Sequence, residues 1–174
     1  MFVTVVVGNP KPQSRTLAVA TAVADAVEER LGTRPSAPRL TIDLADFGGR
    51  LIDWGDQEVT GLVEKMIESD LLIVASPTYK ATYTGLLKVF LDRVPAPALR
   101  PAVAVPLMMG GSPVHSLAPE VHLRPLLVEL GASCPTAGLF VLESQLGELP
   151  VVIDTWLDGA EHSLRRALTS QGVS

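Results

Sequence analysis

A loop rich in hydroxyl and basic side chains follows the first apolar segment of the chain. Residues 2–7 are apolar or β-branched, and Gly8-Asn9-Pro10-Lys11-Pro12-Gln13-Ser14-Arg15-Thr16 comes directly after them, before a helical pattern begins. The unpaired N–H groups and the dipole at the start of a helix favour an anion there. Ser14 and Thr16 could add hydroxyl donors, and Lys11 and Arg15 could add positive charge. The same residues are equally consistent with a helix capped by Ser14 and two solvated cations.

Two further loops carry residues suited to binding. Ser76-Pro77-Thr78-Tyr79-Lys80-Ala81-Thr82-Tyr83-Thr84-Gly85 follows the apolar segment 71–75, and a turn begun by proline could present backbone groups to the polar edge of a flat heterocycle. The alternative is a tight turn in which the two tyrosines only pack. Gly110-Gly111-Ser112-Pro113 follows the apolar segment 102–109. Paired glycines let the backbone approach a ligand closely, although they also suit a flexible turn.

The elements around these loops predict an α/β protein. Segments 2–7 and 71–75 are apolar on both faces, as strands buried in a parallel sheet are, and further strands are expected at 39–44, 102–109 and 135–142. Helices are expected at 16–31, 58–69, 84–93, 119–131 and 149–168. Strands that alternate with helices form a three-layer sandwich around a parallel sheet. Ligands bind such sheets beyond the carboxyl ends of the strands, where all three loops lie.

Composition limits the remaining possibilities. A length of 174 residues predicts one domain over residues 1–174. Fourteen Lys and Arg against 19 Asp and Glu give a net charge of −5 with no basic run, which argues against a nucleic-acid partner. The single cysteine, Cys134, permits no internal disulfide and no cysteine-based zinc site. No apolar run approaches the ~18 residues of a membrane helix, so we expect a cytoplasmic protein without membrane or metal binding.

The three loops together resemble those of the NADPH-dependent FMN reductase family. The first is similar to that family's phosphate loop, and Pro77-Thr78-Tyr79 with Tyr83, Gly85, Leu87 and Lys88 matches its flavin-ring loop. The Gly-Gly-Ser loop with His115 is most similar to the branch that serves alkanesulfonate monooxygenases. The resemblance extends from residue 1 to about residue 131 and implies a flavodoxin-like fold with a five-stranded parallel sheet in the order 2-1-3-4-5.

The resemblance also implies an FMN site and assigns residues to it. Asn9, Lys11, Ser14, Arg15 and Thr16 would surround the phosphate. Pro77, Thr78, Tyr79 and Lys80 would border the flavin ring, and Gly110, Gly111 and Ser112 would flank its other edge. No catalytic acid or base is expected, because the flavin carries the chemistry.

Two departures from the family pattern stand out. Asn9 and Lys11 occupy positions where the family often has Ser and Arg. Lysine keeps the positive charge but cannot make the bidentate hydrogen bonds that a guanidinium makes with a phosphate. The alkanesulfonate branch has an inserted tyrosine and a π-bulge in the helix after the third loop. The corresponding stretch here, Pro119-Glu120-Val121-His122, has no tyrosine, so the resemblance leaves open whether the bulge is present.

The function implied by the resemblance is hydride transfer from NADPH or NADH to FMN, with reduced FMN passed to a monooxygenase. One alternative is a reductase that retains FMN and reduces a quinone, azo dye or metal ion. A flavodoxin-type electron carrier is another, although residues 109–117 lack an aromatic to cover the ring. A protein without flavin on the same fold is the third. The family resemblance also implies a homodimer or homotetramer formed through the helices after the third and fourth strands.

Overall fold

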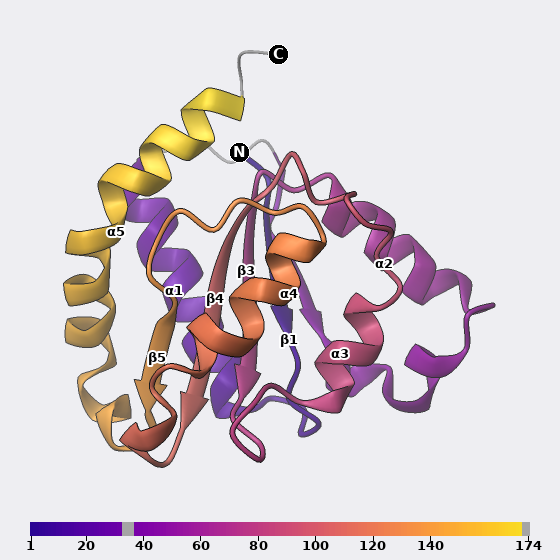
Figure 1. Cartoon of the computed structure of the whole chain (residues 1–174), viewed down its shortest axis with the longest axis horizontal. Coiled ribbons are helices and arrows are strands. Elements are labelled where there is room, and N and C mark those ends of the chain that lie inside the picture. Colours follow the sequence, from indigo (N-terminus) through magenta and orange to yellow (C-terminus); the bar gives the residue numbers. More distant parts are fainter. Residues whose placement is uncertain (33–36, 172–174) are drawn as a thin grey trace.

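The computed structural model describes residues 1–32 and 37–171, which build a parallel sheet flanked by helices (Figure 1). The strands are β1 (Val3–Val7), β2 (Leu40–Asp43), β3 (Leu71–Pro77), β4 (Val103–Gly110) and β5 (Leu139–Leu142). The main helices are α1 (Arg15–Leu31), α2 (Gln57–Ile67), α3 (Gly85–Leu91), α4 (Arg124–Glu129) and α5 (Leu149–Gln171). The strand order is β2-β1-β3-β4-β5, and every pair is parallel, which confirms the predicted α/β architecture and order.

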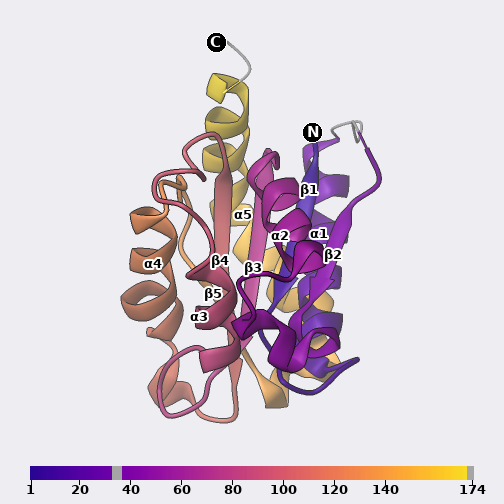
Figure 2. The ribbon, with the colours of Figure 1, turned by 90° about the vertical axis from the view of Figure 1, so that its right-hand side faces the viewer.

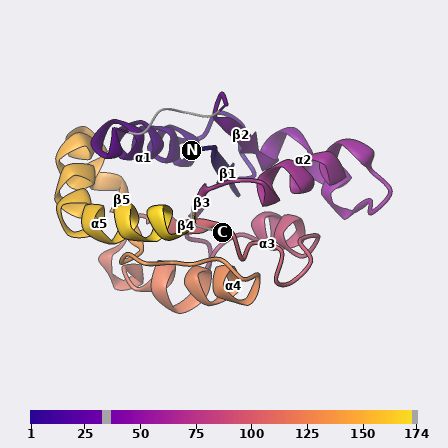
Figure 3. The ribbon, with the colours of Figure 1, turned by 90° about the horizontal axis from the view of Figure 1, so that it is seen from above.

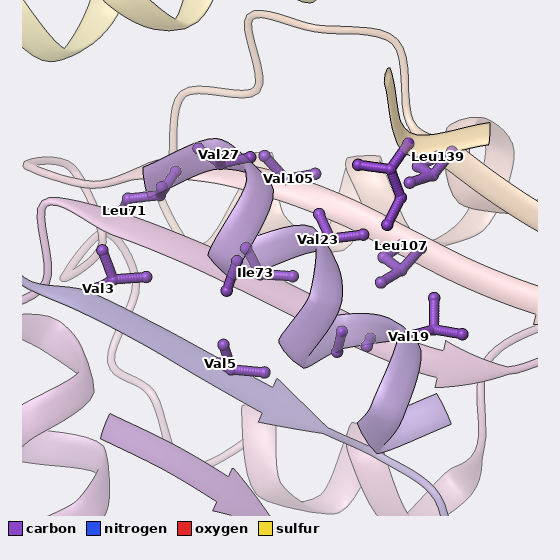
Figure 4. Close-up of a cluster of buried hydrophobic side chains, with 14 of the residues drawn as sticks. Val3, Val5, Val19, Val23, Val27, Leu71, Ile73, Val105, Leu107 and Leu139 are labelled. Carbon is purple, nitrogen blue, oxygen red and sulfur yellow. The ribbon is translucent and has the colours of Figure 1, made fainter. Parts of the chain in front are cut away.

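The helices form a layer on each face of the sheet. Helices α1 and α5 pack together on one face, and α2, α3 and α4 cover the other (Figures 2 and 3). Figure 4 shows Val3 and Val5 of β1 and Ile73 of β3 directed toward the α1 side, while Val6 belongs to the cluster on the opposite face. Each central strand therefore buries both of its faces, which explains its unbroken apolar sequence.

The fifth strand is shorter than predicted, and Pro106 gives the reason. Ala104 in β4 donates its N–H to Ser133 O at 2.7 Å. In a continuous ladder the next donor on this side of β4 would be residue 106, two positions later. Residue 106 is a proline and has no N–H to donate. The chain leaves the sheet after this bridge and rejoins it only at Leu139. Residues 135–138, predicted as strand, therefore lie outside the sheet.

Side chains of the helical segment that precedes this stretch, residues 119–129, satisfy the backbone that has left the sheet. The Arg124 guanidinium donates to the carbonyl oxygens of Cys134 and Thr136, and the Glu120 carboxylate accepts the N–H of Gly138. Arg124 and Glu120 also bond to each other, with Nη2 and Oε1 2.9 Å apart. A Cβ at Gly138 would lie 2.7 Å from Pro119 Cβ, so only glycine allows this close approach.

The predicted helix at 119–131 begins as a π-helical turn, Pro119–Leu123, before α4. The missing tyrosine left the presence of a π-turn open, and the structure shows that this sequence does form one. Arg124 donates its backbone N–H to Pro119 O, five residues back. Pro125 then offers no N–H, and its ring would clash with the carbonyl four residues earlier in a regular α-helix. A wider turn relieves that clash.

The segment between β2 and α2 contains two 3-10 turns, Leu44–Asp46 and Gly48–Ile52. Arg93, just beyond α3, holds this segment and is only 9% exposed. Its guanidinium donates to Asp53 O at 2.7 Å and to Thr60 Oγ1 at 2.9 Å. It also lies 5.5 Å from the ring of Trp54. No helix in the described ranges is long and apolar enough to cross a membrane.

Candidate functional site

A cleft of about 410 Å³ opens at the carboxyl edge of the sheet, where β1 and β3 end. It is lined by seven of the twelve predicted site residues: Asn9, Lys11, Ser14, Arg15, Thr16, Pro77 and Tyr79. Gln13, Met109 and Glu143 complete its wall. Larger hollows of about 660 and 710 Å³ lie between α1 and α5 and along the end of α5. Of these three cavities among the described residues, the cleft at the strand ends is the one that joins two of the predicted loops with a helix N-terminus.

The first loop is braced from within. Ser14 caps α1, because its Oγ accepts the N–H of Leu17 at 3.2 Å. Asn9 donates from Nδ2 to Thr16 Oγ1 at 2.9 Å, and its Oδ1 accepts the N–H of Lys11 at 2.9 Å. Both hydroxyls thus use an acceptor position and keep their proton for another partner. The capping and anion-binding interpretations of Ser14 are therefore compatible.

A carboxylate on β2 holds the middle of the same loop. Gln13 has a left-handed φ of 50°, and its N–H points to Asp43 Oδ2 at 3.3 Å. The other oxygen of Asp43 accepts the N–H of Ala45 at 3.3 Å. Burial raises the pKa of the Asp43 carboxyl above its ordinary value, although both N–H groups act in the opposite direction. Asp43 fixes the loop from outside the cleft.

Positive charge at the cleft comes from Lys11 and Arg15, and both side chains are exposed. Arg15 is already paired, since its Nη2 lies 3.1 Å from Glu143 Oε1. Glu143 follows β5 immediately and begins a 3-10 segment, Glu143–Glu148. The cleft therefore holds an acidic group next to its main cation.

The second loop is tied to the first beneath the cleft. Thr84 caps α3, accepting the N–H of Leu87 at 3.1 Å, and its hydroxyl donates to Gly8 O. A Cβ at Gly8 would lie 2.5 Å from Leu87 Cβ, so glycine is required for this contact between β1 and α3. Ser76 Oγ accepts the N–H of Thr84 at 3.0 Å and closes the loop.

The tip of the second loop is a strained turn. Lys80 and Ala81 have φ values of 53° and 69°, and Tyr79 and Thr82 form an antiparallel bridge around them. Two left-handed residues at the centre of a four-residue turn are typical of a type I′ turn, which normally uses glycine or asparagine. Tyr79 is 51% exposed at its start.

The third loop lies against the base of the second. Thr78 donates its N–H to Met109 O at 2.7 Å, which places the ends of β3 and β4 side by side. A Cβ at Gly110 would meet Thr78 Oγ1 at 3.3 Å and Phe140 Cζ at 3.1 Å, whereas one at Gly111 would point into open space. Thr78 Oγ1 is buried and has no hydrogen-bond partner within the described residues.

Five predicted residues do not line the cleft: Thr78, Lys80, Gly110, Gly111 and Ser112. They lie next to it, on the turn and on the third loop. Sequence reasoning missed Gln13, Met109 and Glu143. Met109 is the last apolar residue before the glycine pair at the end of β4, so the sequence could have indicated its place in the cleft. Glu143 gave none, because its place depends on how β5 joins the sheet.

Comparisons with known proteins find similar sequences and folds. The model of a family described as NADPH-dependent FMN reductase matches residues 1–147. An FMN reductase (NADPH) from Escherichia coli strain K12 is 43% identical over 83 residues, which are 48% of this chain and 44% of that protein. The chain therefore aligns with less than half the length of that relative.

Solved structures extend the similarity over nearly the whole chain. The apo form of an NADH:FMN oxidoreductase, EMOB, has a TM-score of 0.75 and 31% identity, covering 98% of this chain and 87% of that one. A flavodoxin from the domain Archaea shares the fold at 17% identity, with a TM-score of 0.61 over 94% of this chain and 99% of that one. The fold is flavodoxin-like, as the motifs predicted.

Proposed function

Because the chain belongs to the NADPH-dependent FMN reductase family, we propose that it transfers hydride from NADPH or NADH to FMN and supplies reduced FMN to a flavin-dependent monooxygenase. The observation that carries this proposal is the pair of hydroxyls, Ser14 and Thr16, at the N-terminus of the 17-residue helix α1. Each has a proton available for a phosphate, and the helix dipole favours a dianion at that point.

The residues fit FMN at both ends of the molecule. The phosphate would bind among Asn9, Lys11, Ser14, Arg15 and Thr16. The ring would lie beside Pro77, Thr78, Tyr79 and Lys80, with Gly110, Gly111 and Ser112 at its other edge. The buried Thr78 hydroxyl, which has no hydrogen-bond partner among the residues that the structure describes, and the open space at Gly111 support this placement. When bound, the flavin accepts the hydride, so the chain's own residues only bind, orient and shield it.

The experiment compares FMN with riboflavin, which lacks the phosphate. Ser14→Ala/Thr16→Ala should weaken FMN binding by about 10²–10³-fold, because hydrogen bonds to charged groups contribute ~1.5–3 kcal/mol each. Riboflavin binding should barely change. Equal affinity of the native protein for both flavins, or equal weakening of both in the variant, would show that this loop is only a capped turn.

The fate of the flavin is tested by NADPH and NADH oxidation with and without added FMN. A rate that depends strongly on added FMN indicates a reductase that releases its flavin to a partner. A rate that does not, in yellow purified protein, indicates the alternative reductase that retains FMN for a quinone, azo dye or metal ion. Reduction of bound flavin by neither nucleotide would favour a flavodoxin-type carrier.

We also propose that the protein is a homodimer or homotetramer formed through the α3–α4 face. Most apolar positions on these helices serve the core, since Leu87, Phe90, Leu123 and Leu127 are fully buried. Support comes instead from Leu117, Val121 and Val128, which are 66%, 56% and 53% exposed on and before α4. Light scattering that gives the monomer mass of 18.5 kDa at micromolar concentration would refute this.

A further inference from the structure

The ion pair between Arg15 and Glu143 joins two distant parts of the chain inside the cleft. Arg15 is the first residue of α1, and Glu143 is the first residue after β5. Their Nη2 and Oε1 atoms are 3.1 Å apart, and both residues line the cleft together with Ser14 and Thr16. The Glu143 carboxylate therefore pairs with a guanidinium nitrogen of Arg15 that an incoming phosphate would otherwise bind.

The exposure of the pair shows that it does not hold Arg15 rigidly. The side chains of Arg15 and Glu143 are 63% and 44% exposed, and ion pairs this open to water contribute little to stability. Arg15 is thus free to exchange one partner for the other.

A bound phosphate dianion and the Glu143 carboxylate would share one guanidinium. Two groups bonded to the same guanidinium lie roughly 6 Å apart, where a like charge still repels appreciably in water-like surroundings. Lys11 is the other cation on the cleft wall. The net effect of Glu143 on a phosphate ligand is unfavourable.

We propose that Glu143 sets the affinity for FMN by competing with the flavin 5′-phosphate for Arg15, which keeps binding weak enough for the flavin to leave. This inference rests on the proposed function, because it requires the phosphate of FMN to bind at the start of α1. It gives a physical basis for flavin release that acts at the phosphate end and leaves the ring end unchanged.

The test is the Glu143→Gln variant, which keeps the shape of the side chain and removes its charge. FMN should bind about 3- to 10-fold more tightly to this variant, measured by quenching of flavin fluorescence. Riboflavin affinity should remain within about twofold, and about 0.5 M NaCl should narrow the gain for FMN because salt screens the repulsion. Glu148→Gln is the matched control: it removes the same charge from the other end of the same 3-10 segment, outside the cleft lining.

Three results overturn the inference. Unchanged FMN affinity in Glu143→Gln would show that the carboxylate does not compete. Weaker FMN binding with unchanged riboflavin binding would show that Glu143 positions Arg15 for the phosphate. An equal gain in Glu148→Gln would show a general charge effect. In each case the native protein still prefers FMN to riboflavin; loss of that preference would instead refute the proposed function.

Discussion

Replacing Arg93 with methionine should destabilise the protein severely, although Arg93 touches no part of the cleft. Its guanidinium makes two short hydrogen bonds, to Asp53 O at 2.7 Å and Thr60 Oγ1 at 2.9 Å. Longer contacts reach Leu51 O at 3.3 Å and Asp56 O at 3.4 Å. Methionine keeps the apolar stem and removes every donor, so the loss isolates the polar contacts.

The size of the effect follows from the two short bonds. Hydrogen bonds made by a charged donor contribute ~1.5–3 kcal/mol each, which gives an upper range near 6 kcal/mol. Water can reach part of this segment, since Asp53 is exposed, and the variant no longer buries a charge. We therefore expect the free energy of unfolding to fall by about 2–4 kcal/mol.

Urea unfolding followed by tryptophan fluorescence measures this loss, and Trp54 beside Arg93 makes the segment itself visible. Arg93→Lys should recover only part of the stability, because an ammonium cannot reach acceptors on both sides. Arg100→Met, at an exposed position, is the control and should change little. A loss below about 1 kcal/mol in Arg93→Met would refute the view that this arginine holds the segment between β2 and α2.

Three further predictions concern other parts of the molecule. The hydrogen bonds from Arg124, followed by the N–H of Gly138, lower the pKa of the Glu120 carboxyl below its ordinary 4.5. Glu120→Gln should therefore lower the unfolding free energy by about 1–2 kcal/mol at pH 7. Urea unfolding across pH should show this deficit disappear as the pH falls below 4.5 and through the lowered pKa of the native carboxylate. Burial raises the pKa of the Cys134 thiol to about 11, which lowers the fraction of reactive thiolate at pH 8. A thiol reagent should therefore react with the native protein ~10²-fold more slowly than with the urea-unfolded chain. Equal rates would contradict this prediction. Ala81→Gly relieves a φ of 69° and should raise the unfolding free energy by about 0.5–1 kcal/mol; a thermal melt showing a loss would argue against strain in the turn.

The sequence was most informative where one element decides its own structure. The apolar runs of β1, β3 and β4 identified buried parallel strands, and the loops after them marked the edge that holds the cleft. The strand order came from the family resemblance, since apolar patterning does not distinguish one parallel neighbour from another.

What was missed depends on contacts between distant segments. The shortened β5 follows from a missing donor at Pro106 on its neighbour, and the π-turn follows from Pro125 opposing the regular turn before it. Arg93 and Glu143 are charged residues without any periodic signal, and their positions become defined only when α3 and β5 have docked. A single sequence does not reveal such pairings.

The excursion of the chain beside Pro106 has an evolutionary consequence. Pro106, Glu120, Arg124 and Gly138 serve one arrangement, in which side chains replace a stretch of ladder. Replacing Pro106 alone with a residue that has an N–H would leave that donor without a β-strand partner. Losing Arg124 alone would leave the carbonyl oxygens of Cys134 and Thr136 without their donor. Substitutions at these four positions should therefore be epistatic, because each is tolerated only when the other three change as well. In evolution the four residues should be replaced together.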